Sequence, residues 1–528
     1  MDYIDFPLRE KPNDTIIVGI VAVLCFYRSI WMYSGDTICA IATGMAGSGI
    51  GVIRVSGDRA IEICDRIFVG KKRVSEMETF TAAYGHIVDP GAAGAAPDAA
   101  HKDSSAADAA PEEPNNKYSK KGVIDEVIVL VMKAPHSYTT EDTVEIDCHG
   151  GVFLMEKVLG LLIREGARIA EPGEFTKRAY LGGRIDMSEA EAVMDVINAE
   201  TENALSASVG QLRGDLKERI ASLREEILYN TAYIESALDD PENYSLEGFR
   251  EKLGESVDRV SIDVKDMLQS FDEGRLVKEG IRTAIIGKPN AGKSSVLNML
   301  LREERAIVTD VAGTTRDTLE EYARLSGVLL KLIDTAGIRE TDDKVEKIGV
   351  DKAEENIKAA DLILFVADGA RPLDEDDKRI IRSLAGKKVI TLINKEDLPI
   401  AISRDELEEE LKNILSDDKA IEKPRILTTS AKEGQGREEL ATLIKEMFLT
   451  GEARGNGQIV ISNERHKNAL FDAEQALSRV KDSIENELPE DFYTIDLMAA
   501  YESLGLITGE TLADDLADKI FAEFCMGK

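Results

Sequence analysis

Two kinds of hydrophobic spacing divide this chain. Short apolar runs, typical of buried strands, occupy residues 281–286, 328–333 and 389–393. Apolar residues spaced three or four positions apart, typical of amphipathic helices, occupy residues 205–227 and 469–484. This order predicts an α/β domain with a helical block on each side. Because each helical block has an apolar stripe that needs a partner, we expect the two blocks to pack together around an inserted domain.

The first helical block is predicted in more detail. Ser188 and Glu191 have the spacing of a capping box, which predicts a helix start at this point. One long helix is then expected up to Asp240-Pro241. The apolar residues of this pattern are Leu205, Val209, Leu212, Leu216, Ile220, Leu223 and Ile227. Those of the second block are Ala469, Ala473, Ala476, Val480 and Ile484.

Two segments of the N-terminal third interrupt the folded pattern. Residues 89–122, between predicted strands at 84–88 and 123–132, are rich in Ala, Pro, Asp and Ser, which predicts a disordered insertion. Residues 16–26 are apolar but shorter than the roughly 20 residues of a membrane span. Because the residues before them mix acids with bases, they do not resemble a signal peptide either. We therefore hypothesise that Met32 is the true start and that residues 1–31 are a doubtful extension.

The strand at 281–286 leads into the sequence from Gly287 to Ser294, which has the form G-x-x-x-x-G-K-S, and a predicted helix follows at 295–301. This strand–loop–helix order is the context that a phosphate loop requires. Backbone N–H groups and the helix N-terminus would surround phosphate oxygens. We expect Lys293 to reach the β- and γ-phosphates and the Ser294 hydroxyl to bind Mg²⁺.

Further motifs complete a guanine-nucleotide site. Thr315 is the expected switch hydroxyl for Mg²⁺, and Asp334 follows a predicted strand, where it can hold the metal through water. The carboxylate of Asp397 can accept two hydrogen bonds from guanine, whereas adenine offers no such donor pair. The predicted GTP-binding residues are Asn290, Ala291, Gly292, Lys293, Ser294, Ser295, Thr309, Asp310, Val311, Ala312, Gly313, Thr314, Thr315, Asp334, Thr335, Ala336, Gly337, Asn394, Lys395, Asp397, Ser430, Ala431 and Lys432.

The residue that orients water for hydrolysis is less clear. Ile338 stands where Ras-like switches carry a glutamine, and an isoleucine cannot orient water. Glu346 can replace the glutamine, although its spacing is also that of a solvated helix charge. A monovalent cation is the other alternative, held by the Asn290 side chain and by carbonyls of the loop 309–314.

Outside this domain, the chain resembles the MnmE (TrmE) family of tRNA-modification GTPases over most of residues 36–528. The resemblance is carried by residues 36–38, 49–57, 134–142, 145–151 and 172–179, and by a Cys-x-Gly-Lys tail at 525–528. It implies a multi-domain α/β and α protein with a doubly wound GTPase domain inserted into a helical domain. The boundaries that we expect are 32–183 for an N-terminal α/β folate-binding and dimerisation domain, 184–275 and 453–528 for the helical domain, and 276–452 for the GTPase domain.

The resemblance also implies roles for individual residues. Glu346 is expected to orient the catalytic water, beside catalytic roles for Lys293 and Cys525. The implied K⁺ ligands are Asn290, Thr309, Val311 and Thr314, and those of Mg²⁺ are Ser294 and Thr315. A tetrahydrofolate derivative of the 5-formyl or methylene type would contact Arg54, Glu145, Arg184 and Lys528. The family usually has lysine at the position of Arg184, and the arginine keeps the charge but changes the geometry.

The family also implies a reaction and partners: a K⁺-stimulated GTP hydrolase, as a homodimer, working with the flavoprotein MnmG in a heterotetramer-type complex. Together they install an aminomethyl-type group at C5 of the wobble uridine of tRNA. Two alternatives remain. One is a ribosome-assembly GTPase of the Era-like type, although the basic RNA-binding stretch that such a protein needs is absent. The other is a folate-dependent one-carbon transferase regulated by GTP.

Composition changes this picture at three points. Five cysteines without paired spacing, and no convincing secretion signal, predict free thiols and a cytoplasmic protein without a membrane span. Five scattered histidines make a transition-metal site improbable. The net charge of −34 argues against a general nucleic-acid-binding surface. If tRNA binds, a local patch or the partner protein must attract it.

Overall fold

The computed structural model describes residues 35–93, 122–301, 321–333, 355–415, 424–449, 459–510, 514–525 and 527. The chain divides into two compact units. The first unit comprises the residues up to Asp186 together with those from Ala513 onward, and the second comprises Met187–Leu512. The C-terminal tail therefore groups with the N-terminal unit, whereas the sequence analysis grouped it with the helical domain.

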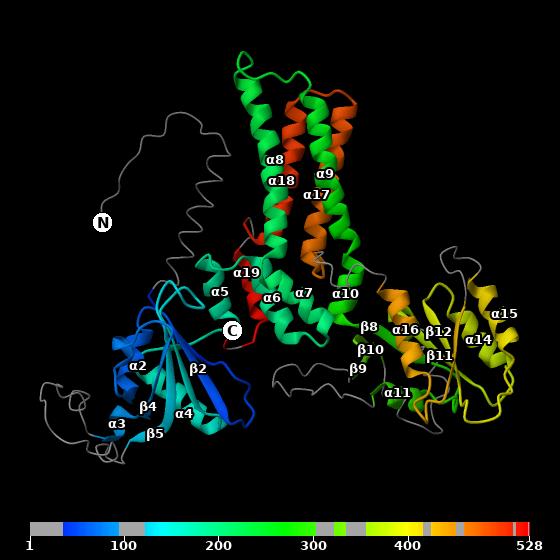
Figure 1. Cartoon of the computed structure of the whole chain (residues 1–528), viewed down its shortest axis with the longest axis horizontal. Coiled ribbons are helices and arrows are strands. Elements are labelled where there is room, and N and C mark those ends of the chain that lie inside the picture. The colour runs from blue at the N-terminus through cyan, green and yellow to red at the C-terminus, as the bar shows by residue number, and fades with distance from the viewer. Residues whose placement is uncertain are drawn as a thin grey trace, which may run out of the picture. The chain divides into compact units, whose positions relative to one another are not determined.

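The first unit is built on one seven-stranded sheet with the strand order β3-β4-β5-β6-β2-β1-β7. Figure 1 labels β2, β4 and β5 of this sheet. Its neighbouring strands are antiparallel, except for the parallel pair β1 and β7. The strands are β1 (Ile38–Ile41), β2 (Ile50–Ser56), β3 (Phe68–Gly70), β4 (Thr81–Val88), β5 (Val123–Met132), β6 (Thr143–His149) and β7 (Arg168–Ile169). The helices are α2 (Ala60–Ile67), α3 (Pro90–Ala93), α4 (Val152–Arg164), α5 (Glu174–Leu181) and α19 (Asp514–Ala522), with a 3₁₀ turn at Val74–Glu76.

One face of this sheet makes the core. In β5, Val127, Val129 and Val131 are buried while Ile128 is 46% exposed, so the strand alternates as a half-buried strand should. The buried residues join side chains of α2 and α4, such as Ile63 and Val158, in one cluster. The strands predicted at 84–88 and 123–132 are confirmed as β4 and β5.

The helical part of the second unit joins segments from both sides of the GTPase domain. Leu216 and Ile220 of α8 share a core with Leu470 and Leu477 of α17. Figure 1 shows the long helices α8, α9, α17 and α18 side by side. The expectation that the two helical blocks pack together is therefore confirmed. The helices are α6 (Met187–Asn198), α7 (Glu202–Leu212), α8 (Asp215–Asp239), α9 (Phe249–Gln269), α10 (Phe271–Glu279), α17 (Glu464–Glu485) and α18 (Asp491–Thr508).

Two local predictions in this region are wrong. The single long helix is broken between α7 and α8, because Gly214 adopts a left-handed conformation with φ of 92°. The apolar spacing continues across this break, which hid it. The predicted capping box at Ser188 and Glu191 is also wrong. α6 already begins at Met187, and the carboxylate of Glu191 binds Arg465 and His466. The predicted helix end before Pro241 is confirmed.

The GTPase domain has a six-stranded sheet with the order β13-β12-β11-β8-β10-β9. All pairs are parallel except β9 with β10. The predicted doubly wound α/β fold is confirmed, and the carboxyl ends of the parallel strands meet at one edge, where such folds bind ligands. The strands are β8 (Ile281–Ile286), β9 (Glu321–Leu325), β10 (Val328–Leu332), β11 (Leu362–Asp368), β12 (Val389–Asn394) and β13 (Arg425–Thr429). The helices are α11 (Lys293–Leu301), α14 (Glu375–Ser383), α15 (Arg404–Leu415) and α16 (Arg437–Phe448).

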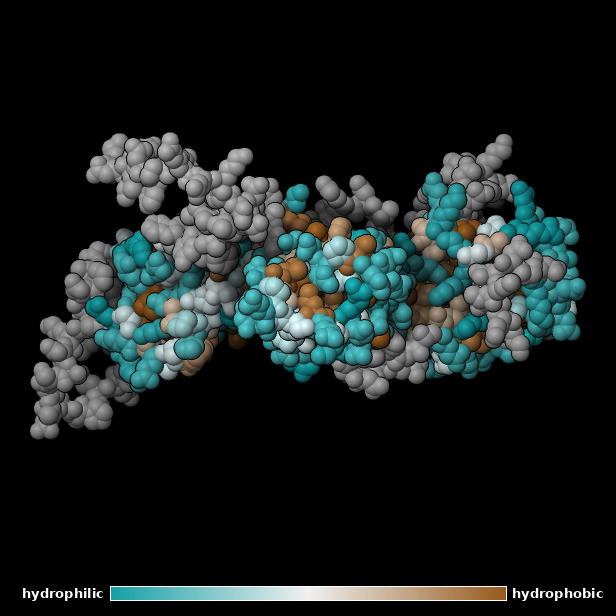
Figure 2. Space-filling model, turned by 90° about the horizontal axis from the view of Figure 1, so that it is seen from above, coloured by the Kyte–Doolittle hydropathy of each residue, from teal (hydrophilic) through white to brown (hydrophobic). Residues whose placement is uncertain are grey.

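The surface agrees with a charged composition. The face in Figure 2 is mostly hydrophilic, with small separate hydrophobic areas. None of the helices in the described part of the chain has the length and apolar character that crossing a bilayer requires. The doubtful extension 1–31 and residues 94–121 of the predicted insertion lie outside the described residues.

Candidate functional site

The phosphate loop connects β8 to α11, as predicted. A Cβ on Gly287 would lie 2.3 Å from the carbonyl oxygen of Val366, so only glycine fits beside β11. Gly292 has φ of 102°, and a Cβ there would lie 2.1 Å from the side-chain nitrogen of Asn394. Both glycines are therefore required by conformation and by close approach. The loop places Lys293 and Ser294 at the first turn of α11.

Lys293 lies across this loop. Its ammonium group donates to the carbonyl oxygens of Gly287 and Lys288, at 2.9 Å each. Burial lowers the pKa of Lys293, because the ammonium ion is partly desolvated. A partly buried cation bound to neutral carbonyls is well prepared to bind phosphate oxygens, which carry full negative charge. The Gly-rich loop, the helix N-terminus and this cation fit a nucleotide phosphate group.

The base-recognition residues come together at the ends of β12 and β13. The side chain of Asn394 donates to the Ala291 carbonyl and accepts from the Ala431 N–H, both at 3.0 Å, so one amide connects three loops. Asp397 accepts a hydrogen bond of 2.8 Å from Ser430. A pocket between these loops is lined by Gly292, Ser295, Asn394, Lys395, Asp397, Leu398 and Lys432. The structure thus gathers the predicted base-recognition residues around one pocket.

Sequence reasoning missed the acidic partners of this site. Lys395 binds Asp368, at the end of β11, at 2.7 Å. Burial alone would raise the pKa of Asp368, but the hydrogen bond from Lys395 lowers it. Lys288 of the phosphate loop binds Asp374 at 2.6 Å and Asp376 at 3.2 Å. The position of Asp368 after an apolar run, where strands end at the ligand edge, was the available signal.

Several predicted residues lie outside the described part of the chain. These are Thr309, Asp310, Val311, Ala312, Gly313, Thr314, Thr315, Asp334, Thr335, Ala336, Gly337, Ile338 and Glu346, together with Lys528. Of the expected K⁺ ligands, only Asn290 is described. It is exposed and has φ of 63°, so its side chain is accessible at the loop surface.

A second polar site lies on the sheet of the first unit. Arg54 on β2 and Glu145 on β6 are cross-strand partners, and the guanidinium donates at 2.8 Å and 2.7 Å to one carboxylate oxygen. Both side chains are largely buried, at 12% and 19% exposure. Asp147, two residues along β6, has a raised pKa because of burial and the charge of Glu145.

Aromatic rings complete this site. The guanidinium carbon of Arg54 lies 5.0 Å from the centre of the Tyr138 ring and 5.6 Å from that of Phe175. Arg184 lies 4.7 Å from the Tyr138 ring and donates to the Tyr138 carbonyl at 2.7 Å. Three of the four residues that the resemblance assigned to folate, Arg54, Glu145 and Arg184, therefore lie together. Tyr138 and Phe175 belong to segments that carried the resemblance but were not singled out.

The C-terminal tail reaches the same place. Arg54 donates to the Gly527 carbonyl at 3.2 Å. Gly527 has φ of 88°, and a Cβ there would lie 2.5 Å from the Ile41 carbonyl. Cys525 is an exposed free thiol, and its carbonyl accepts from the Gly173 N–H at 3.4 Å. Cys39, Cys64 and Cys148 are free and buried, so the expectation of unpaired thiols is confirmed for the described cysteines.

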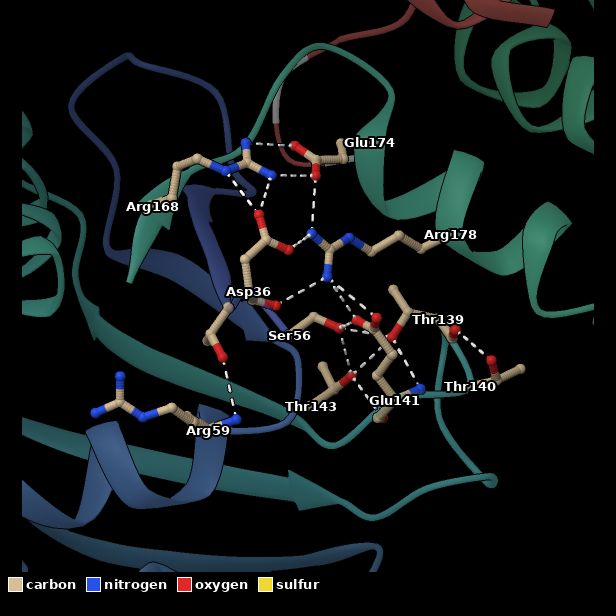
Figure 3. Close-up of polar contacts among 11 residues, drawn as sticks. Asp36, Ser56, Arg59, Thr139, Thr140, Glu141, Thr143, Arg168, Glu174 and Arg178 are labelled. Carbon is tan, nitrogen blue, oxygen red and sulfur yellow. Dashed lines mark hydrogen bonds and ion pairs between the residues drawn. The ribbon is translucent and has the colours of Figure 1, made fainter. Parts of the chain in front are cut away.

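Beside this site, a network of ion pairs centred on a buried arginine holds α5 and the loop 134–142 (Figure 3). Arg178, 4% exposed, binds Asp36 at 2.7 Å, Glu174 at 2.9 Å and Glu141 at 3.1 Å. Arg168 binds Asp36 and Glu174 from the other side, at 2.7 Å and 2.6 Å. Because Tyr138 and Phe175 neighbour these residues in sequence, the network fixes the segments that carry both rings.

Comparison with known proteins identifies the family of the chain. The model described as GTP-binding protein TrmE N-terminus matches residues 37–184, and that described as MnmE helical domain matches residues 187–525. A protein of Lachnoclostridium phytofermentans named tRNA modification GTPase MnmE is 50% identical over 93% of this chain and 99% of its own length. The chain belongs to the MnmE family of tRNA modification GTPases.

Another relative and one solved structure are also similar to this chain. An MnmE protein of Acetivibrio thermocellus is 43% identical over 94% of this chain and 100% of its own. A solved structure, the G domain of the T. maritima FeoB iron transporter, is 27% identical over 31% of this chain and 97% of that chain, with a TM-score of 0.23. The resemblance stated from the sequence motifs is thus confirmed as MnmE family membership.

Proposed function

We propose that this chain is a K⁺-stimulated GTP hydrolase that, with a flavoprotein partner, modifies C5 of the wobble uridine in tRNA. The observation that carries the proposal is the combination, in one chain, of the guanine-type pocket at Asp397 and the second polar site at Arg54 and Glu145. Relatives named tRNA modification GTPase MnmE support the tRNA substrate.

The phosphate end of the nucleotide site supports hydrolysis. Lys293 would neutralise charge on the β- and γ-phosphates, and Ser294 with Thr315 would hold Mg²⁺, which supplies further positive charge. Glu346 would orient the attacking water in place of the glutamine that Ile338 replaces. Asn290, Thr309, Val311 and Thr314 would hold K⁺. Replacing K⁺ by Na⁺ should then slow GTP turnover, and equal rates would contradict the cation role.

The second site fits a tetrahydrofolate derivative in kind. A pterin presents N–H donors that suit a carboxylate, and its glutamate tail suits arginines. Glu145 is already bound to Arg54, so a pterin edge would have to share or replace that ion pair. Tyr138 offers a ring for stacking between the two arginines. Lys528 is a further expected contact, and Cys525 is expected to have a catalytic role.

The same proposal includes the assembly: a homodimer, joined by the flavoprotein MnmG, acting on tRNA in the cytoplasm. The net charge of −34 makes a general attraction to tRNA unfavourable. We therefore expect the flavoprotein partner to supply most of the basic surface.

Mass analysis of wobble nucleosides tests the proposal. A strain lacking the gene should lose the modified nucleoside, and the wild-type gene should restore it. A Lys293→Ala gene should fail to restore it, whereas Lys265→Ala, on an exposed face of α9, should succeed. Unchanged nucleosides after deletion would remove tRNA modification from the function. Altered ribosome profiles with unchanged nucleosides would favour the Era-like alternative instead.

A further inference from the structure

A tightly packed turn connects the helical region to the GTPase sheet. Helix α10 ends at Glu279, Gly280 has φ of 83°, and β8 begins at Ile281. A Cβ on Gly280 would lie 3.0 Å from Cγ of Leu329 and 3.2 Å from its carbonyl oxygen. This turn between the helical region and the GTPase domain therefore packs directly against β10.

The residue opposite Leu329 contacts the helical region at a second place. Arg324 on β9 is the cross-strand partner of Leu329. Its guanidinium forms an ion pair with Glu200, which lies between α6 and α7. Its carbonyl accepts a hydrogen bond of 3.3 Å from Arg437 of α16. One cross-strand pair of the β9–β10 hairpin thus touches the helical region at two separate points.

Apolar packing supports both contacts. Ala204 of α7, 6% exposed, and Val277 of α10, 9% exposed, belong to the same hydrophobic core as Ala323 and Leu325 of β9. Ala199, beside Glu200, packs against this core. Because close-packed cores have low compressibility and transmit strain, elements that share one core tend to move together.

Two further polar contacts tie α10 into this region. Asp361, just before β11, accepts from Arg275 of α10 at 3.4 Å and from Arg282 of β8 at 2.9 Å. Lys278 of α10 binds Asp195 of α6 at 2.8 Å. The helices α6 and α10 and the strand β8 are therefore connected by charges as well as by packing.

The hairpin also lies next to the nucleotide site. β10 pairs in parallel with β8, which continues into the phosphate loop at Gly287. In the sequence, β9 follows the segment that contains Thr315, and Asp334 follows shortly after β10. A nucleotide that moves the phosphate loop or these motifs acts directly on the strands that contact the helical region.

We propose that the Glu200–Arg324 ion pair and the Gly280–Leu329 contact form a coupling interface through which bound nucleotide repositions the corner between α6 and α7. Glu200 and Arg324 are positioning residues, since neither lines the nucleotide pocket. The movement of the corner depends only on GTP binding. Its use in tRNA modification rests on the function proposed above.

Hydrogen exchange of the full-length chain, measured by mass spectrometry, tests the coupling. In the wild type, a non-hydrolysable GTP analogue should change exchange in residues 195–212 by about five-fold or more, the lower range of allosteric coupling. In Arg324→Gln and Glu200→Gln, the change should fall below about two-fold while nucleotide affinity stays within about two-fold of the wild type. The double variant with exchanged charges, Glu200→Arg with Arg324→Glu, should restore much of the response.

A matched control separates coupling from stability. Arg479→Gln breaks an exposed ion pair with Asp496 inside the helical bundle and should leave the nucleotide response intact. The side chains of Glu200 and Arg324 are 38% and 37% exposed, so their variants should still fold. An unchanged nucleotide response in Arg324→Gln, or no response in the wild type, would overturn the proposal. Because this readout needs neither tRNA nor folate, failure of the wobble-nucleoside test leaves its result unaffected.

Discussion

The nucleotide site and the Arg54 site are assembled in different ways. Most of the described nucleotide-binding groups come from short loops at strand ends, and backbone atoms provide many of their contacts, as with Lys293 and Asn394. The Arg54 site joins side chains of β2, β6 and the loop 134–142 with a backbone carbonyl of the C-terminal tail. A site made of local loops is visible in the sequence as motifs whose chemistry can be interpreted directly, whereas one made of distant side chains could be expected here only from the family resemblance.

The largest expected effect concerns Asp397, which belongs to a short motif of the nucleotide site. Asp397→Asn would place an amide donor opposite the guanine donors, so preference for GTP over the xanthosine nucleotide should fall by about a thousand-fold or more. Competition binding with both nucleotides measures this preference.

The control for that substitution is Ser430→Ala. It removes only the 2.8 Å hydrogen bond to Asp397, so affinity should fall several-fold, by about 1 kcal/mol, without a change of base preference. Retained GTP selectivity in Asp397→Asn would show that another group recognises the base.

The next effect concerns the charges that support the Arg54 site. Glu174, 2% exposed, binds Arg168 and Arg178, and Glu174→Gln should lower the free energy of unfolding by about 3 kcal/mol because it leaves the buried Arg178 underpaired. Glu171→Gln, on an exposed side chain three residues earlier, is the matched control and should change it little. Chemical denaturation of both variants measures the difference.

The same carboxyl predicts a pH dependence. Burial alone would raise the pKa of Glu174, but hydrogen bonds from Arg168, the Glu171 N–H and Arg178 lower it below the ordinary value of 4.5. A lowered pKa in the folded state contributes stability above pH 4.5 that is lost as the pH falls below it. Glu174→Gln should therefore flatten the acid side of the stability curve. If the acid side of the stability curve is unchanged in this variant, other carboxyl groups cause the acid sensitivity.

Arg54→Gln tests whether the distant side chains form one binding site. Removing a charge-assisted contact should weaken binding of 5-formyltetrahydrofolate by about ten-fold or more, which calorimetry can measure. Arg59→Gln removes an exposed arginine of the same unit, paired with Glu62, and should have little effect. If both variants bind equally well, Arg54 serves only as the partner of Glu145. If the wild type does not bind, the folate proposal itself fails.

The same contrast explains what the sequence could predict. The strands β8, β10 and β12, the phosphate loop and the residues around Asp397 followed from apolar runs and motif order, because their geometry is local. The break at Gly214 was missed because the apolar spacing of α7 and α8 is continuous across it. The pairing of Glu191 with Arg465 and His466 was missed because 274 and 275 residues separate these partners. The contact of Arg54 with Gly527, 473 residues away, has the same cause.

The smallest expected effect concerns a lysine of the phosphate loop whose partners in ion pairs are exposed. Lys288 belongs to the phosphate loop, but its ammonium group binds Asp374 and Asp376, whose side chains are 48% and 74% exposed. Exposed ion pairs contribute little, so Lys288→Ala should change GTP affinity and turnover by less than about two-fold. Lys293→Ala in the same loop is the contrasting variant, because that ammonium group is partly buried and binds carbonyl oxygens of the loop. A large effect of Lys288→Ala would mean that Lys288 leaves the aspartates and contacts the nucleotide. The position of a residue in the motif would then predict its role better than the ion pairs that its side chain forms in the structure.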